Sequence, residues 1–358
     1  MDRTQLTHEE VRIARGTRTG VAVAVAVHST ARGPAIGGVR IKPYPSWRDG
    51  VDDVLRLSEA MTMKCALAEL DHGGGKTVAV LPPGGWDPRR RTDLITDIAE
   101  AIDGFDGRYR CGPDIGSTPD DMSLIHRLAR GYAFCRPESE GGSGNSSAAT
   151  ARGVVAALRA GLRHRHGDDR VTGRRIGLIG FGHVGRLVAG DLVASGATVL
   201  VTDVDTGLAG PVERSGARWS TADLLTEELD VLVPAATGGL LTDRVARDCR
   251  AALIVGPANN QLADDTVDRV LHERGITWVP DVLASIGGIV HAVSREEAGL
   301  DDTATDARVD RIGERTAALL TYATDHRITP LAAARRMAGS TPVPRPPADR
   351  GPDGHRRA

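Results

Sequence analysis

The run Ile176-Gly-Leu-Ile-Gly180-Phe-Gly182-His-Val-Gly185 places three glycines in the spacing Gly-x-Gly-x-x-Gly. An apolar strand is predicted before the glycines, over 175–179, and a helix after them, over 184–194. The first two glycines of such a turn allow close approach of a pyrophosphate, and the third lets the helix pack on the strand. The helix N-terminus stabilises the phosphate charge. The run therefore predicts a Rossmann-type dinucleotide site formed by Gly180, Gly182, His183, Val184 and Gly185.

Asp203 ends the next predicted strand, eighteen residues after Gly185. A carboxylate at this place accepts hydrogen bonds from the adenosine ribose and repels a 2′-phosphate, which favours NAD over NADP. Strands and helices continue to alternate beyond it. The predicted elements cover 230–234, 251–255, 262–274 and 276–280. This rhythm predicts a parallel sheet with helices on both faces.

Two loops at the strand ends of this sheet are further candidates. One reads Pro234-Ala-Ala236-Thr237 and the other reads Ala258-Asn259-Asn260-Gln261. The open end of such a sheet is where a nicotinamide lies, so Ala236, Thr237, Asn259 and Asn260 are expected at the cofactor. Loop capping is the alternative role for one of the asparagines.

Two lysines twelve positions apart, Lys64 and Lys76, mark the first half of the chain. A lysine on backbone without Cβ atoms can lie deep against a ligand, and three glycines precede Lys76. Two converging ammonium groups lower each other's pKa, so that one binds a carboxylate while the other acts as a base. Two unrelated surface lysines are the alternative.

The surrounding elements are predicted from hydrophobic spacing. Strands are expected over 20–28, 77–81 and 108–111, and helices over 48–63 and 92–104. Both glycine-rich segments, from Gly33 to Arg40 and from Gly73 to Lys76, are interpreted as turns.

Asp114 follows the third of these strands in a loop bounded by glycine and proline. Such an aspartate is either catalytic or a turn and helix-capping residue. His72 and His291 are expected to be structural, because neither has an acid–base partner at a suitable spacing.

Composition excludes several classes of protein. The 358 residues carry a net charge of −2, without the basic excess that nucleic acids or membrane surfaces require. The four cysteines are scattered and lack zinc-ligand spacing with histidine, which is typical of reduced thiols in a cytoplasmic protein without a metal. No apolar run reaches membrane-span length, and the polar start is not a signal peptide.

An α/β protein of two domains with a cleft between them is expected. The small-residue stretch from Gly141 to Ser146 marks the boundary between a substrate domain, 1–146, and an NAD-binding domain, 147–311. Helices over 303–324 and 329–338 follow, and the part from 312 to 338 is expected to pack back on the first domain. The proline-rich tail, 339–358, is expected to be disordered.

Six motifs in this order resemble the Glu/Leu/Phe/Val amino-acid dehydrogenases. They are Gly33-Pro-Ala-Ile-Gly-Gly, Met61-Thr-Met-Lys, Gly73-Gly-Gly-Lys, Pro113-Asp-Ile-Gly, the Gly180–Gly185 fingerprint and Ala258-Asn-Asn-Gln. The resemblance implies NAD-dependent oxidative deamination of an L-amino acid to its 2-oxo acid, with release of ammonia, by a homo-oligomer. It implies that Lys64 binds the substrate carboxylate, Lys76 activates water and Asp114 moves protons at the amino group.

The resemblance also assigns pocket residues. Ile36, Gly37 and Gly38 would line the substrate, and Asn145, Thr150 and Ser285 the cofactor. Three wall positions of the branched-chain members are Gly112, Ile289 and Ala292 here. Two of the three are smaller than in those members, and no polar group is placed to hold a glutamate side chain. Phenylalanine is therefore favoured, with leucine, valine or an unusual amino acid of specialised metabolism as alternatives.

One departure from the family concerns residues 285–288. The family usually has Asn-Ala-Gly-Gly where this chain has Ser285-Ile286-Gly-Gly. Serine is shorter than asparagine and makes fewer hydrogen bonds, and Ile286 adds bulk. We expect weakened turnover or a shifted substrate, and a catalytically weakened NAD-binding homologue stays an alternative.

Overall fold

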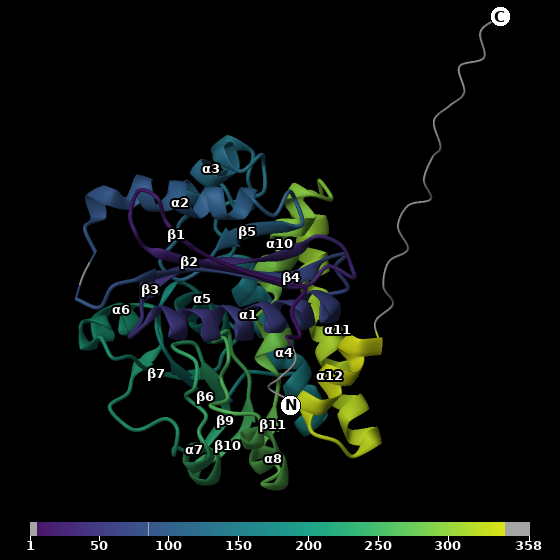
Figure 1. Ribbon diagram of the computed structural model, residues 1–358. Coiled ribbons are helices and arrows are strands. Elements are labelled where there is room, and N and C mark those ends of the chain that lie inside the picture. The colour runs from purple at the N-terminus through teal and green to yellow at the C-terminus, as the bar shows by residue number, and fades with distance from the viewer. Residues whose placement is uncertain (1–5, 85, 341–358) are drawn as a thin grey trace, which may run out of the picture.

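The computed structural model describes residues 6–84 and 86–340, which form two α/β domains. Each domain is built on its own sheet, and the two sheets lie one above the other in Figure 1. None of the helices among the described residues is long and apolar enough to cross a bilayer.

The first sheet is mixed and has the strand order β1-β2-β4-β3-β5. Its strands are β1 (Glu10–Arg15), β2 (Ala22–Ser29), β3 (Ala35–Pro43), β4 (Gly73–Leu81) and β5 (Tyr109–Pro113). β1 and β4 run antiparallel to β2, whereas β3 runs parallel to both β4 and β5. The carboxyl-terminal part of β5 therefore lies beside the middle of β3.

Helices cover both faces of this sheet. They are α1 (Trp47–Leu67), α2 (Arg91–Asp103) and α3 (Pro119–Leu128). α1 lies on the face toward the second domain, and α2 and α3 lie on the opposite face (Figure 1). Ser46 and Asp49 form a capping box that begins α1, and the helix carries Lys64 in its last turn.

The segment from Gly73 to Lys76 is strand instead of a turn, and the segment from Gly33 to Arg40 is a turn only at Gly33 and Pro34, before β3 begins. Gly73, Gly74 and Gly75 open β4, and Gly37 and Gly38 lie inside β3. The reason is close packing: a Cβ atom at Gly74 would lie 2.1 Å from the backbone nitrogen of Thr62 in α1. Glycine here lets a helix approach a strand rather than letting the chain turn.

The second sheet is parallel and has the order β11-β10-β9-β6-β7-β8. Its strands are β6 (Arg175–Ile179), β7 (Thr198–Thr202), β8 (Arg218–Trp219), β9 (Leu229–Pro234), β10 (Ala251–Ile254) and β11 (Thr277–Trp278). The predicted parallel sheet is confirmed. After β6 the chain adds β7 and β8 on one side of that strand, and it then returns to add β9 on the other side. Such a switch in strand order is where a Rossmann fold binds its ligand.

The remaining helices surround the second sheet and connect the domains. They are α4 (Ser147–His166), α5 (His183–Ala194), α6 (Ala209–Arg214), α7 (Asp243–Asp248), α8 (Thr266–Glu273), α9 (Asp281–Ala284), α10 (Gly287–Glu296), α11 (Asp302–His326) and α12 (Pro330–Ser340). α11 packs along α4, and α12 contacts both α11 and α1.

The C-terminal helix differs from the expectation at its end. Thr329 caps α12 through the Ala332 N–H, and Pro330 is its first residue, as predicted. The expected disordered tail began at 339, but Gly339 and Ser340 still belong to α12. The rest of that tail, 341–358, lies outside the described residues.

Candidate active site

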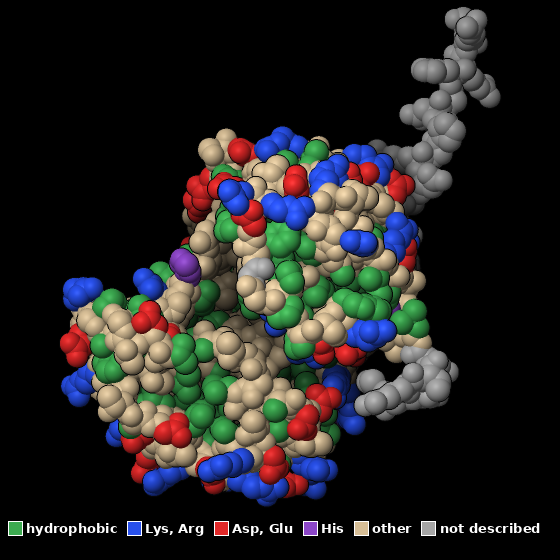
Figure 2. Space-filling model, turned by 60° about the vertical axis from the view of Figure 1, so that its left-hand side comes forward, with side chains coloured by type: hydrophobic (Ala, Val, Ile, Leu, Met, Phe, Trp, Pro, Cys, Tyr) green, Lys and Arg blue, Asp and Glu red, His purple; other side chains and the backbone are tan. Residues whose placement is uncertain are grey.

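A cleft separates the two domains, and Figure 2 shows the surface hollowed between the two lobes. It contains a cavity of about 300 Å³. Fourteen of the predicted site residues line it: Ile36, Gly37, Gly38, Lys64, Lys76, Gly112, Asp114, Thr150, Val184, Asn259, Asn260, Ser285, Ile289 and Ala292. Residues from distant parts of the chain and from both domains thus meet in one place.

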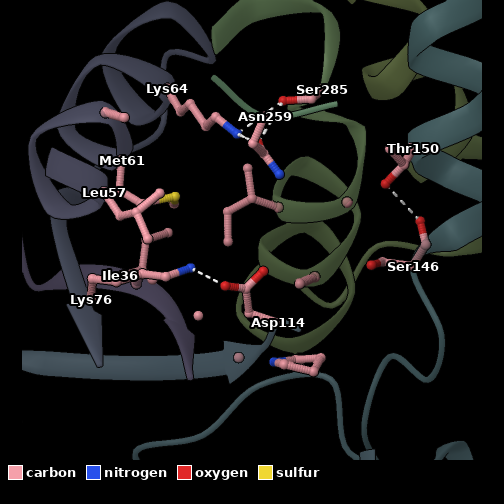
Figure 3. A pocket seen from close by; sticks show the side chains of 18 of the residues that line it. Ile36, Leu57, Met61, Lys64, Lys76, Asp114, Ser146, Thr150, Asn259 and Ser285 are labelled. Carbon is pink, nitrogen blue, oxygen red and sulfur yellow. Dashed lines mark hydrogen bonds and ion pairs between the residues drawn. The ribbon is translucent and has the colours of Figure 1, made fainter. Parts of the chain in front are cut away.

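Lys76 and Asp114 form an ion pair on the substrate-domain wall. The Nζ atom of Lys76 lies 2.7 Å from Oδ2 of Asp114 (Figure 3). Only 5% of Lys76 is exposed. A Cβ atom at Gly38 would lie 2.7 Å from Cβ of Asp114 and 2.9 Å from Nζ of Lys76. The glycine therefore leaves the space in which this pair meets, and Asp114 does not serve as a helix cap.

The protonation of this pair is set by burial and by neighbouring charges. Burial lowers the pKa of Lys76, and the charge of Arg40 lowers it further, whereas Asp114 raises it; the net shift is downward from 10.5. Burial raises the pKa of Asp114, but Lys76 and Arg40 outweigh that effect and hold it well below its usual range. Asp114 is thus a carboxylate at neutral pH, beside an amine that loses its proton more readily than an ordinary lysine.

Lys64 extends from α1 toward the second domain. Its ammonium donates hydrogen bonds to Oδ1 of Asn259 and, at 2.9 Å, to Oγ of Ser285 (Figure 3). Burial lowers the pKa of Lys64 and the charge of Lys76 lowers it further, while Asp281 raises it. The expected repulsion between the two lysines therefore acts on Lys64, whereas Arg40 is the neighbouring cation that acts on Lys76.

The altered turn occupies a specific place in the cleft. Ser285 donates from Oγ to the carbonyl of Asp281 at 2.6 Å and accepts from Lys64. Ile286 is fully buried in the hydrophobic core and does not face the cavity. The expected bulk of Ile286 beside the glycines is therefore accommodated in the core, and of these two residues only Ser285 lines the cavity.

The glycine turn of the second domain opens toward solvent at the start of α5. Gly180 adopts a φ of +106°, and a Cβ atom there would lie 2.7 Å from the nitrogen of Ala236. Gly182 is the N-cap of α5 without a side-chain hydrogen bond, and a Cβ atom there would meet nothing within 4 Å. Free space in front of helical N–H groups fits a pyrophosphate.

Asp203 lies just after β7 and supports the same turn. Its Oδ2 atom accepts a hydrogen bond from the Phe181 N–H at 2.7 Å, and Oδ1 accepts one from the Asp205 N–H at 3.0 Å. The carboxylate is therefore held in a fixed orientation at the end of the strand.

Eight predicted residues do not line the cavity. They are Asn145, Gly180, Gly182, His183, Gly185, Asp203, Ala236 and Thr237. Most belong to the glycine turn and its neighbouring loops, and Val184 joins that turn to the cavity wall. Asn145 is exposed and accepts a hydrogen bond from the Ser147 N–H at 2.8 Å, as a turn residue does.

Both histidines interpreted as structural bond across the chain. His72 contacts the Pro34 carbonyl and the carboxylate of Glu297, and Nε2 of His291 lies 3.0 Å from the Ser143 carbonyl. Neither lines the cavity.

Several residues that line the cavity were not predicted from the sequence, chiefly Arg40, Leu57, Met61, Phe134, Cys135 and Asp281. Arg40 follows Gly38 by two positions in β3, and this spacing alone places both on one face of the strand. Phe134 and Cys135 had no such local pattern, because they reach the site through a bridge between Ala133 and Cys111. Burial raises the pKa of Cys135 to about 12, so its thiol stays protonated.

Comparison with known protein families assigns a class to this two-domain fold and its cleft. Residues 2–130 match the family model described as Glu/Leu/Phe/Val dehydrogenase, dimerisation domain, and residues 209–338 match the model described as Glutamate/Leucine/Phenylalanine/Valine dehydrogenase. Residues 149–244 match the NAD binding domain of D-isomer specific 2-hydroxyacid dehydrogenases.

Named relatives agree with this class. The chain is 36% identical over 336 residues to valine dehydrogenase of Streptomyces virginiae, covering 92% of each chain. It is 34% identical over 336 residues to phenylalanine dehydrogenase of Thermoactinomyces intermedius, covering 92% of this chain and 90% of the relative. The crystal structure of L-tryptophan dehydrogenase from Nostoc punctiforme is similar with a TM-score of 0.76 and 29% identity, covering 93% of this chain and 95% of that chain. The chain belongs to the Glu/Leu/Phe/Val dehydrogenase family and is an amino-acid dehydrogenase.

Proposed function

We propose that the protein catalyses the NAD-dependent oxidative deamination of a hydrophobic L-amino acid, with phenylalanine as the favoured substrate. The observation that carries the proposal is the convergence of Lys64 and the Lys76–Asp114 pair on one cavity beside the Gly180–Gly185 turn. In the net reaction, the amino acid, NAD⁺ and water become the 2-oxo acid, NADH, ammonium and a proton.

Each of the three charged residues has a role that its surroundings support. Lys64 binds the substrate carboxylate, since its ammonium is fixed by Asn259 and Ser285 at the cavity wall. The Gly180–Gly185 turn would hold NAD⁺, which would supply the hydride acceptor for the substrate Cα. Lys76 in its neutral form takes a proton from the water that adds to the resulting imine carbon. Asp114 exchanges protons with the substrate nitrogen, which leaves as ammonia when the C–N bond breaks.

The preference for a large apolar side chain rests on the cavity walls. Ile36, Leu57, Met61 and Phe134 supply apolar surface. A Cβ atom at Gly112 would meet nothing within 4 Å, so this wall leaves free space. Relatives named for valine and for phenylalanine differ by only two points of identity, which does not separate the two substrates.

NAD is the proposed cofactor because Asp203 presents a fixed carboxylate beside the glycine turn. Its two backbone hydrogen bonds hold the charge in place, and a 2′-phosphate would be repelled there. The Gly180 and Gly182 geometry supplies the space for the pyrophosphate.

A homo-oligomer is proposed on the match of residues 2–130 to a dimerisation domain. β1 is an edge strand of the first sheet, and Ile13 on it is 49% exposed. Light scattering coupled to size-exclusion chromatography measures the mass in solution; a monomer at micromolar concentration would contradict this part.

The experiment that tests the function is a substrate panel. Phenylalanine, tryptophan, leucine, valine and glutamate are each supplied with NAD or NADP, and the rate of reduced cofactor formation is measured. We expect the highest kcat/KM with phenylalanine and NAD. Turnover of glutamate alone, or none of the five, would contradict the proposal.

A further inference from the structure

Arg40 lines the cavity and is only 6% exposed. It connects two carboxylates. Its Nε atom donates to Oδ2 of Asp114 at 2.8 Å, and its Nη1 atom donates to Oδ2 of Asp53 at 3.0 Å. A buried guanidinium shared by two carboxylates is held by geometry as well as by charge.

Asp53 anchors the far side of this arginine. It accepts a hydrogen bond from the Tyr44 hydroxyl at 2.7 Å, and Arg56 donates to its other oxygen at 2.6 Å. Asp53 projects from the buried face of α1 and is 9% exposed. α1 and β3 are thereby joined through a polar contact directly beneath the catalytic pair.

The two oxygens of Asp114 have different surroundings. Oδ2 accepts a hydrogen bond from Nε of Arg40 at 2.8 Å and forms an ion pair with Nζ of Lys76 at 2.7 Å. No residue in the part of the chain that the structure describes donates to Oδ1, and in Figure 3 this oxygen points into the cavity. Because Arg40 and Lys76 both contact Oδ2, Oδ1 is the oxygen of Asp114 that is left to contact a substrate.

The charges also matter for Lys76. With Asp114 as its sole close partner, the amine would be held as an ammonium and could not accept a proton from water. Arg40 is a second cation on the same carboxylate oxygen. Its charge opposes the effect of Asp114 on the pKa of Lys76, which burial already lowers.

We propose that Arg40 is a positioning residue of the catalytic centre. It fixes Asp114 with Oδ1 toward the substrate, and its guanidinium shares with Lys76 the other carboxylate oxygen, Oδ2. The inference rests on the proposed function, and it adds a third cation with a role distinct from those of Lys64 and Lys76.

The test compares the pH dependence of kcat/KM for phenylalanine in the unmodified protein and in Arg40→Gln. In the unmodified protein, we expect kcat/KM to rise with pH as Lys76 loses its proton. Without the charge of Arg40, Lys76 holds its proton more tightly. We expect the rising limb of the Arg40→Gln profile to move to higher pH by about one unit. At pH values below the limb, kcat/KM is then about tenfold lower than in the unmodified protein, and above the limb this difference shrinks.

Two further variants make the test specific. Arg40→Lys keeps the charge but cannot bridge both carboxylates as the planar guanidinium does. Its limb should stay in place while kcat falls at every pH. Arg56→Gln removes a cation from Asp53 without touching Asp114, and its profile should match that of the unmodified protein. Binding of NADH, followed by fluorescence, reports whether each variant is folded.

The outcomes separate the inference from the function beneath it. An active protein whose limb does not move in Arg40→Gln, with only a uniform loss of rate, means that Arg40 is merely structural. If Arg40→Gln fails to bind NADH, the test uses Arg40→Lys instead. A kcat of Arg40→Lys equal to that of the unmodified protein refutes the positioning role. Absence of turnover in the unmodified protein removes the proposed function and the inference together.

Discussion

Substitution of Gly112 by alanine tests the assignment of the substrate pocket. Gly112 lies in β5 opposite Gly38 of β3, and its φ is not in the left-handed region, so alanine fits the backbone. The new Cβ atom would meet nothing within 4 Å and would occupy the free space at the cavity wall. Because Gly→Ala in a strand adds roughly 0.5–1 kcal/mol of stability, the melting temperature should not fall.

The expected effect is a change of specificity. One methylene group in an apolar pocket is worth about 1–3 kcal/mol, or roughly 10–200-fold in kcat/KM. A phenyl ring that uses the space beside Gly112 loses this amount, whereas the smaller valine side chain does not reach the new methyl. We therefore predict that the ratio of kcat/KM for phenylalanine to that for valine falls about tenfold or more.

The assay is the initial rate of NADH formation over a range of each amino acid. Gly190→Ala is the matched control, because a Cβ atom at Gly190 in α5 also meets nothing within 4 Å but lies outside the cavity. It should leave the ratio unchanged. An unaltered ratio in Gly112→Ala would refute the placement of the substrate side chain against this wall.

Four other substitutions follow from the site. Lys76→Ala removes the base and should lower kcat by about 10²–10⁴-fold, with NADH binding retained as the control. Lys64→Met removes a charged hydrogen bond worth about 1.5–3 kcal/mol and should raise KM at least tenfold, measured by saturation kinetics. Asp203→Asn keeps an acceptor for the Phe181 N–H but removes a charge, so the ratio of NADP to NAD turnover should rise roughly tenfold. Ser285→Asn introduces the residue that the resemblance leads us to expect there and should raise turnover of phenylalanine or leucine; equal rates would count against a weakened site.

The nucleotide-binding domain was more predictable from the sequence than the first domain. The Gly180–Gly185 run lies between a short apolar strand and a helix, so its three glycines have local context that specifies their use. The predicted bounds of β6 agree with the structure. Short-range spacing carries this information because the turn, the strand and the helix are neighbours along the chain.

The glycines of the first domain were harder to interpret. Gly73–Gly75 have the composition of a turn, yet they form a strand because Thr62 of α1 and Tyr109 of β5 occupy the space of their Cβ atoms. This reason is a tertiary contact, and no local pattern shows it. In the same way, the absence of a side chain at Gly38 leaves the space in which Lys76 and Asp114 meet.

Residues recruited from distant segments could not be placed by spacing. Lys64 and Ser285 are 221 positions apart and share a hydrogen bond. Arg40 was within reach of the sequence, since it shares a face with Gly38. Its importance depends on contacts with Asp53 of α1 and Asp114 after β5, so that three different elements supply the three residues. The sequence therefore predicts the site as separate motifs, whereas the contacts of Arg40 with Asp53 and Asp114 are visible only in the structure.

We propose above that the site formed by Lys64, Lys76 and Asp114 catalyses the oxidative deamination of a hydrophobic amino acid, with NAD as the hydride acceptor. Its most direct measurement is the stoichiometry of one reaction: phenylalanine and NAD are supplied, and NADH, the 2-oxo acid and ammonium are each quantified. We predict that all three form in equal amounts, and that Lys76→Ala suppresses all three together. NADH without ammonium, or ammonium formation that survives Lys76→Ala at an unchanged rate, would contradict the account.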